Sequence, residues 1–410
     1  MRAGSSCGPI ASVPPARMLL VVGLILFITF VGIGIIVPLF PFFGERIGAS
    51  PETITLAVAV GAFGQLVSTP YWGWLSDRIG RRPVLLLSLV GSTIANVLLA
   101  FADSLSWLLV SRLVAGLTSG IIAVAFATVS DVTAGEARTR AMGRIGAAFS
   151  FGFMMGPALG GLLAGSDASA TDYFGIAMMA ASLDVLALII AWRFLPETHP
   201  PEHRSEAPLF DWNVAARALA HPVLTRLAIA NLLFAGGFAV IDSLLPLFGN
   251  RVHAFTPMQI GYVFTGMGFV STLVQACAVG WVSQRLGLYV AVMCGLSIFG
   301  IGHALIAISP VPAVLVAGAL CIAIGFGLFN APSSTLVTTV AATTERGTVL
   351  GVFQGAGNIG RTLTPLYSGW LFTTLGTAAP FAAAALMLVP AVVAVLAARR
   401  AARRAALRVA

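Results

Sequence analysis

The chain has 410 residues, of which 58% are hydrophobic and only 9% are charged. Soluble domains carry about 25% charged residues, so this composition excludes an ordinary soluble enzyme or a nucleic-acid-binding domain and predicts a membrane protein. All 23 basic residues are Arg, and most of them lie in short segments between apolar stretches. This pattern indicates membrane topology rather than an acidic partner.

Twelve apolar segments are long enough to cross a bilayer, since a spanning helix needs about 20 residues. We place them at residues 18–43, 53–75, 83–102, 106–130, 141–165, 173–194, 226–248, 257–280, 288–309, 312–338, 347–373 and 378–398. With the N-terminus inside, Arg46 and Arg251 fall outside the cell, Arg112 and Arg361 fall within spans, and the other nineteen arginines lie in the cytoplasm. We therefore expect a multi-pass protein of the inner (cytoplasmic) membrane with both termini in the cytoplasm.

The loop between the second and third spans combines glycines with charged residues. Its motif consists of Gly73, Leu75, Asp77, Arg78, Gly80, Arg81 and Arg82. The glycines let the backbone turn and pack closely, and Asp77 at a helix end can accept hydrogen bonds from Arg or from a helix N-terminus. A charge cluster that only sets topology would explain the arginines but not the positions of Gly and Asp.

The fourth and fifth spans carry further small-residue patterns. Span 4 places Arg112 four residues after Leu108 and four before Gly116, with Gly120 beyond. A charge in hydrocarbon is costly, so Arg112 must face protein or water, either in a functional role or as a structural Arg bound to carbonyls. Span 5 contains Gly143, Gly152, Gly156, Pro157, Gly160 and Gly161. Three of these glycines recur every four residues and predict a face for close helix approach, although glycine stripes also serve plain packing.

A hydrophilic segment divides the chain into two similar halves. We interpret 196–225 as a cytoplasmic linker between six-helix halves at 1–195 and 226–398, followed by a basic cytoplasmic tail at 399–410. The loop motif returns in part from Gly280 to Gly287, at an offset of 207 residues. The residues Gly143, Gly152, Pro157 and Gly161 return as Gly351, Gly360, Pro365 and Gly369, at an offset of 208. Two parallel repeats of six spans are typical of transporters with a substrate site between the halves.

These motifs together resemble the major facilitator superfamily, in particular its twelve-span drug:proton antiporter branch and the tetracycline exporters within it. The resemblance implies an all-α integral membrane fold of two parallel six-helix pseudo-repeats, with no cofactor because the proton gradient drives transport. It also implies that Asp77 holds the cytoplasmic ends of the halves together in the outward-facing state, with Arg138 or Arg140 and the start of span 11 as partners, and that Arg112 serves proton coupling. The chain departs from the tetracycline exporters at Thr29, Ala95 and Phe299, where that group has acidic residues.

Two acidic residues remain deep within the spans, Asp242 in span 7 and Asp184 in span 6. Such carboxyl groups are candidates for proton coupling or substrate binding, and structural hydrogen bonding is the alternative. Polar residues of the later spans, Gln354, Asn358 and Arg361 in span 11 and Asn330 before Pro332 in span 10, are further candidates to line the cavity. Since Arg112 and Asp242 lie at a similar depth, we expect them to pair, directly or through water, when the outer side closes. The alternative is that each contacts its own helix neighbours and that the shared depth is accidental.

The sequence thus predicts a secondary transporter that exports amphipathic small molecules or drugs in exchange for protons. We expect a monomer in the lipid bilayer whose partners are a small-molecule substrate and protons, with no metal and no nucleic acid. A proton-coupled transporter of a sugar or an organic anion is the alternative on the same fold, and the two intramembrane arginines favour its anion version. A membrane-embedded enzyme or channel is a further alternative, but we find no nucleophile-base pair, metal-ligand cluster or selectivity-filter motif in the sequence.

Overall fold

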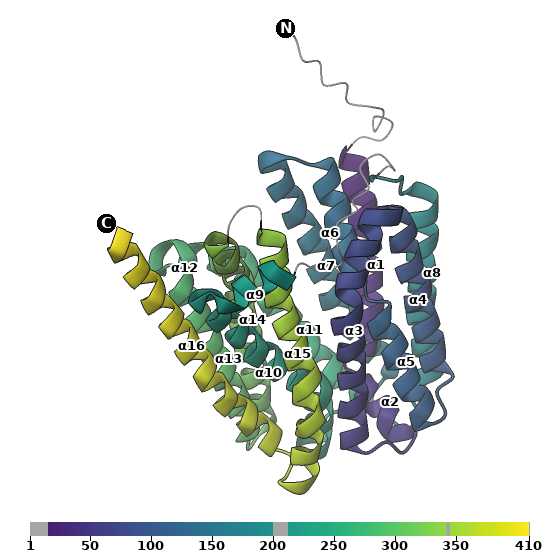
Figure 1. The fold of residues 1–410 in the computed structure, drawn as a ribbon. Helices are drawn as coiled ribbons and strands as arrows, with labels where there is room; N and C mark the ends of the chain where they lie inside the picture. Colours follow the sequence, from purple (N-terminus) through teal and green to yellow (C-terminus); the bar gives the residue numbers. More distant parts are fainter. Residues whose placement is uncertain (1–14, 200–211, 342–344, 410) are drawn as a thin grey trace.

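The computed structural model describes residues 15–199, 212–341 and 345–409, and every regular element in them is helical. Eleven of the helices in these ranges are long and apolar enough to cross a membrane. The one predicted span outside these eleven, 347–373, corresponds to α15, a helix of 29 residues whose glycines pack against α10 and α3. The all-α fold of twelve membrane helices in two halves is therefore as predicted (Figure 1).

The first half runs from α1 to α8. Its helices are α1 (Pro15–Ile36), α2 (Phe40–Arg46), α3 (Pro51–Ile79), α4 (Arg81–Ala100), α5 (Leu105–Leu117), α6 (Ile121–Val132), α7 (Gly135–Ala164) and α8 (Tyr173–Phe194). The second half comprises α10 (Pro222–His253), α11 (Pro257–Leu273), the π-helical turn η2 (Val274–Ala278), α12 (Val279–Leu286), α13 (Leu288–Ala307), α14 (Pro312–Val340), α15 (Arg346–Thr374) and α16 (Ala379–Val409). The predicted linker also contains a helix, α9 (Trp212–Ala220), and the predicted tail continues α16.

Two predicted spans are interrupted. Span 1 divides into α1 and α2 around Pro38, and span 4 divides into α5 and α6 at residues 118–120. At the second break, two carbonyls at the end of α5 accept side-chain hydrogen bonds from α3. Ser68 Oγ donates to the carbonyl of Gly116 over 2.9 Å, and Trp72 Nε1 donates to that of Leu117 over 2.7 Å. The break is tolerated within the membrane because neighbouring side chains satisfy its backbone.

Gly80 makes the turn that the loop motif predicts, whereas the prediction is wrong for Gly73, which lies within α3 and has no atom within 4 Å of an added Cβ. Gly80 ends α3 with φ of +108°, and Gly287 ends α12 with φ of +85°. Both angles lie in a region that favours glycine, so each half makes the same sharp turn into its next helix. The sequence repeat is therefore also a repeat of backbone geometry.

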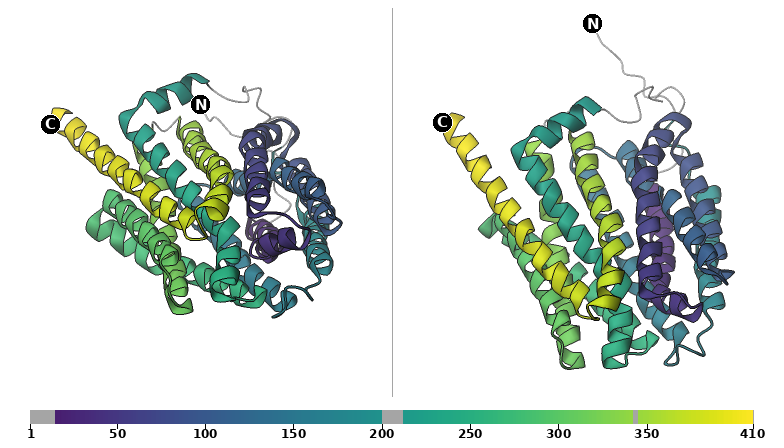
Figure 2. Two further views of the ribbon diagram at one scale, coloured as in Figure 1. Left: turned by 90° about the horizontal axis from the view of Figure 1, so that it is seen from below. Right: turned by 60° about the horizontal axis from the view of Figure 1, so that its bottom comes forward.

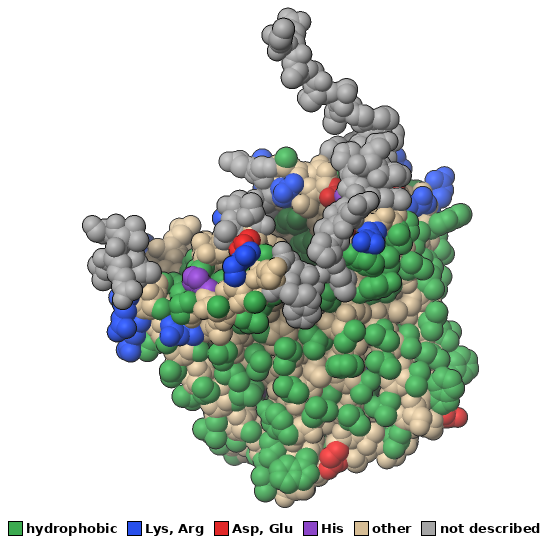
Figure 3. All heavy atoms as spheres, in the orientation of Figure 1, with side chains coloured by type: hydrophobic (Ala, Val, Ile, Leu, Met, Phe, Trp, Pro, Cys, Tyr) green, Lys and Arg blue, Asp and Glu red, His purple; other side chains and the backbone are tan. Residues whose placement is uncertain are grey.

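The two ends of the molecule differ in charge. The start of α1 and the end of α16 lie at the same end, which we call the arginine-rich end, and the opposite end we call the far end (Figures 1 and 2). In Figure 3 the Arg side chains on the visible face gather at the arginine-rich end, and the body below it is mainly hydrophobic. This distribution fits a multi-pass membrane protein whose apolar sides face lipid.

Candidate functional site

The halves touch at the far end through polar and backbone contacts. Arg251 Nη2 of α10 lies 2.7 Å from Glu45 Oε1 of α2, and the amide of Met258 donates to the carbonyl of Gly165 over 3.1 Å. The hydroxyl of Thr373 also donates to the carboxylate of Glu52. These contacts join residues of the two halves and close this end.

Glycines show how closely the helices approach. A Cβ placed on Gly161 of α7 would lie 3.0 Å from the carbonyl oxygen of Met258 and 3.1 Å from the Cα of Gly261, both in the other half. Toward the arginine-rich end the same construction meets no atom within 4 Å at seven helical glycines, whereas at Gly80 it meets the carboxylate of Glu197. The seven glycines are Gly73, Gly143 and Gly146 in the first half and Gly280, Gly347, Gly351 and Gly355 in the second. The structure is thus closed at the far end and loosely packed at the arginine-rich end.

The loop motif forms a charge network around Arg81. Its Nη1 lies 2.5 Å from Asp77 Oδ1 and 2.7 Å from Ser76 Oγ, and its Nε lies 2.9 Å from Asp131 Oδ2. Only 7% of Arg81 is exposed. A buried guanidinium between two carboxylates fixes the ends of α3, α4 and α6 relative to one another.

Two further arginines of the predicted latch, Arg78 and Arg138, have partners other than Asp77. Arg78 lies over the ring of Trp74 at 4.3 Å, and Arg138 donates to the carbonyls of Ser130 and Thr133. Arg140 is exposed. In this conformation, Asp77 pairs with Arg81 at the start of α4 rather than with Arg138 or Arg140 of α7. The resemblance places the latch in the outward-facing state, and the loosely packed arginine-rich end agrees with a different state.

The sequence analysis did not single out Glu197, which joins this network from the segment that follows α8. Its Oε1 accepts the backbone N–H of Arg81 over 2.8 Å, and its Oε2 accepts that of Arg82 over 3.2 Å. Oε1 also accepts the amides of Thr198 and His199. The carboxylate therefore caps the N-terminus of α4, where it interacts favourably with the helix dipole. The feature of the sequence that could have indicated this capping role is the position of Glu197, directly after Pro196 and before a polar segment.

The glycine face of α7 packs directly on α1. A Cβ on Gly156 would lie 2.5 Å from the Cα of Gly34 and 2.6 Å from the carbonyl oxygen of Val31. A Cβ on Gly152 would lie 2.5 Å from the carbonyl oxygen of Phe27, and one on Gly160 would lie 2.6 Å from that of Ile35. Gly152, Gly156 and Gly160 therefore meet one neighbour, whereas Gly161 turns toward the other half.

Within the membrane, Asp242 of α10 faces Arg361 of α15. Asp242 Oδ2 lies 3.9 Å from Arg361 Nη2, and the side chains are 14% and 40% exposed. Oδ1 of Asp242 accepts no hydrogen bond from any described residue. Gln354 is exposed one turn from Asn358, which is half-buried, on the same helix. The backbone carbonyl of Asn330, on α14, accepts the hydroxyls of Ser333 and Ser334.

Arg112 and Asp242 form no direct ion pair in this conformation, so the direct form of the predicted pairing is wrong here. The guanidinium lies over the ring of Phe40 at 4.9 Å, and neither Nε nor Nη2 donates to a described residue. Phe40 belongs to α2, which itself packs against α10. The partner of Arg112 is therefore the ring of Phe40, which depth alone could not predict. The cation nearest to Asp242 is Arg361.

Asp184 lies apart from Asp242, in a polar cluster between α4 and α8. Its Oδ2 accepts hydrogen bonds from Ser92 over 2.6 Å and from Asn96 over 2.9 Å, and the residue is 1% exposed. Ser92 and Asn96 lie one turn apart on α4, so both reach the same carboxylate. These contacts correspond to the structural alternative considered for Asp184.

The chain belongs to the Major Facilitator Superfamily, whose family model matches residues 22–275 and 227–409. It is therefore a membrane transporter for small molecules rather than an enzyme.

Among known proteins, it is 32% identical over 299 residues to the class E tetracycline resistance protein of Escherichia coli, covering 71% of this chain and 72% of the relative. It is 29% identical over 270 residues to multidrug resistance protein 2 of Bacillus subtilis, covering 64% and 66%. Its fold is similar to a crystal structure of a bacterial homologue of the human lysosomal transporter Spinster, with a TM-score of 0.77 and 18% identity over 95% of this chain and 98% of that one. The resemblance to tetracycline and multidrug resistance proteins predicted from the motifs is confirmed.

Proposed function

We propose that this transporter exports amphipathic small molecules or drugs in exchange for protons, by alternating access between its halves. The names of the relatives, which refer to tetracycline and multidrug resistance, support this proposal. The excess of Arg at one end supports an orientation with the arginine-rich end in the cytoplasm of a bacterial-type cell, across the inner membrane. In this orientation the closed far end faces outward. We propose the monomer as the working unit.

The observation that carries the coupling proposal is the pair of Asp242 and Arg361. It joins α10 to α15, and both helices also contact the first half. Protonation of Asp242 would remove the charge that attracts Arg361, so the two helices would lose a restraint within the membrane. Because Gly369 of α15 packs against Glu52 and Thr55 of α3, a shift of α15 would act directly on the closed far end.

A second candidate is proton-coupled transport of a polar metabolite, such as an organic anion or a sugar. It is favoured by Arg112, whose Nε and Nη2 are buried and donate to no described residue. An anionic group of a substrate would satisfy these donors, and Arg361, whose side chain is 40% exposed, offers a second positive charge.

The test is the accumulation of labelled compounds in cells that carry or lack the protein. The panel contains tetracycline, a cationic dye and an aromatic organic anion, each measured with and without a protonophore. We expect the protein to lower accumulation of an amphipathic compound, and the protonophore or Asp242→Asn to abolish this effect. Asp103→Asn, at an exposed loop residue, is the matched control. Accumulation that is unaffected by the protonophore would contradict export, and an effect limited to the anion would favour the second candidate.

A further inference from the structure

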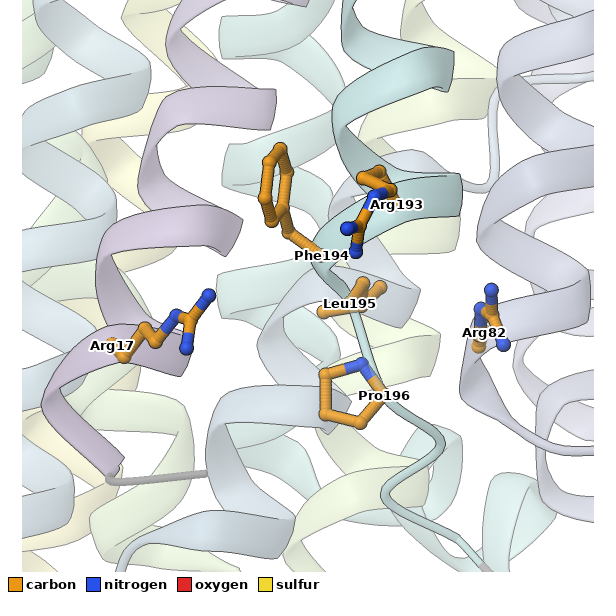
Figure 4. Close-up of a pocket in the computed structure, with 6 residues that line it drawn as sticks. All are labelled: Arg17, Arg82, Arg193, Phe194, Leu195 and Pro196. Atoms are coloured by element: carbon orange, nitrogen blue, oxygen red, sulfur yellow. The ribbon is translucent and has the colours of Figure 1, made fainter. Parts of the chain in front are cut away.

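Three arginines from three different helices surround one pocket at the arginine-rich end. The pocket has a volume of about 260 Å³ and is lined by Arg17, Arg82, Arg193 and residues 194–196. Figure 4 shows Arg17 on α1, Arg82 on α4 and Arg193 on α8, with the segment from Phe194 to Pro196 between them. Arg17 is the third residue of α1, Arg82 the second of α4 and Arg193 the second last of α8. All three therefore lie at the same level, where the spans leave the membrane.

The positive charge of this pocket is not neutralised by the carboxylates of the described residues. None of the three arginines forms an ion pair with a described Asp or Glu. Arg82 donates through Nη2 to the carbonyl of Trp192 over 2.6 Å, while its buried Nε donates to no described residue. Glu197 is close in sequence, but its carboxylate accepts four backbone amides at the start of α4 and its own turn. The pocket thus offers guanidinium donors to an anion from outside the chain.

The side chains around the pocket place it at the border with lipid. Trp192 is 63% exposed and Phe194 is 44% exposed, although both belong to a membrane-spanning helix. Leu20, one turn along α1 from Arg17, is 70% exposed. Exposed aromatic side chains at a helix end are typical of the membrane interface, and apolar side chains beyond them face the acyl chains. A ligand at this level would have its anionic group at the pocket and an apolar part against the helices.

We propose that this pocket binds the phosphate group of an anionic phospholipid, with Arg17, Arg82 and Arg193 as its donors. Basic pockets between membrane helices on the cytoplasmic side are suited to such headgroups. The site holds together the ends of α1, α4 and α8 on the outer face of the first half. The proposal does not depend on which substrate is transported or on proton coupling.

The experiment compares phosphatidylglycerol, which is anionic, with phosphatidylcholine, which carries the same phosphate but no net charge. Purified, delipidated protein is titrated with each lipid, and bound lipid is counted by native mass spectrometry. We expect phosphatidylglycerol to reach half-saturation at a concentration at least tenfold lower than phosphatidylcholine. Inorganic phosphate is the competitor, and we expect it not to displace the lipid. Equal half-saturating concentrations for the two lipids, or displacement of phosphatidylglycerol by inorganic phosphate, would overturn the proposal.

Variants test whether the lipid binds at these arginines. Arg17→Gln combined with Arg193→Gln should raise the half-saturating concentration of phosphatidylglycerol about thirtyfold, since each Arg near an anionic lipid surface contributes roughly fivefold. The matched control, Arg285→Gln with Arg403→Gln, removes two exposed charges at the same end of the other half and should leave it unchanged. Arg17→Lys with Arg193→Lys keeps the charge and should retain most of the binding. An equal loss in the control pair, or no loss in the Gln pair, would contradict the assignment.

Discussion

Gly156→Ala tests whether the glycine face of α7 is required for packing against α1. The added Cβ would lie 2.5 Å from the Cα of Gly34, whereas ordinary van der Waals contact begins near 3.4 Å. Since the nearest atoms are backbone, no side chain can move aside, and the helices would have to separate by about 1 Å. Overpacking of this kind costs about 1–3 kcal/mol.

The matched control is Gly146→Ala on the same helix. A Cβ on Gly146 meets no atom within 4 Å. Both changes gain about 1 kcal/mol of helix propensity, so this gain cancels when the two variants are compared. We therefore expect Gly156→Ala to be less stable than Gly146→Ala by about 1–3 kcal/mol.

Thermal unfolding of the purified protein in detergent, followed by intrinsic Trp fluorescence, measures this difference. Gly156→Leu, which adds three more carbon atoms at the same place, should unfold at a still lower temperature and impair transport. Equal midpoints for Gly156→Ala and Gly146→Ala would refute the reasoning, because the close approach of α1 and α7 would then carry no steric consequence.

Asp77→Asn should abolish transport while expression and membrane insertion stay normal, because the residue serves conformational change. Asp103→Asn is the control, and normal transport by Asp77→Asn would contradict the latch role of Asp77. Glu197→Ala should destabilise the protein by about 1–2 kcal/mol, since the N-terminus of α4 loses its cap; chemical unfolding measures this, and an unchanged midpoint would contradict the capping role. Exchange of the membrane pair, Asp242→Arg with Arg361→Asp, should restore more transport than either single change, and a double variant no better than the worse single one would speak against their pairing.

The positions of the membrane helices could be read from the sequence because each span needs a long apolar segment. The sixth predicted span, at 173–194, coincides with α8 (Tyr173–Phe194). The turn at Gly80 was also predictable, since its positive φ leaves a local mark in the choice of residue. The interruption of span 4 was not, because the hydrogen bonds that make it tolerable come from Ser68 and Trp72 on another helix.

The side-chain partners inside the membrane were harder to predict. Hydropathy and helix rise give the depth of a residue, but they give neither the rotation of its helix nor the angle at which helices cross. Arg112 and Asp242 could be assigned a similar depth, yet the ring of Phe40 and the side chain of Arg361 are their neighbours. Arg has a long side chain, so its partner need not lie at the level of its own Cα.

The contacts that close the far end also set how readily it can reopen. The ion pair of Glu45 and Arg251 joins partly exposed side chains, and such a pair contributes less than about 1 kcal/mol. The hydrogen bonds of Met258 with Gly165 and of Thr373 with Glu52 contribute about 1 kcal/mol each. Their sum, on the order of 3 kcal/mol, is smaller than the roughly 5.5 kcal/mol of differential binding that inverts a 1:99 population. The polar part of this closure is therefore weak enough for the differential affinity of a bound molecule to outweigh it, without a source of mechanical work.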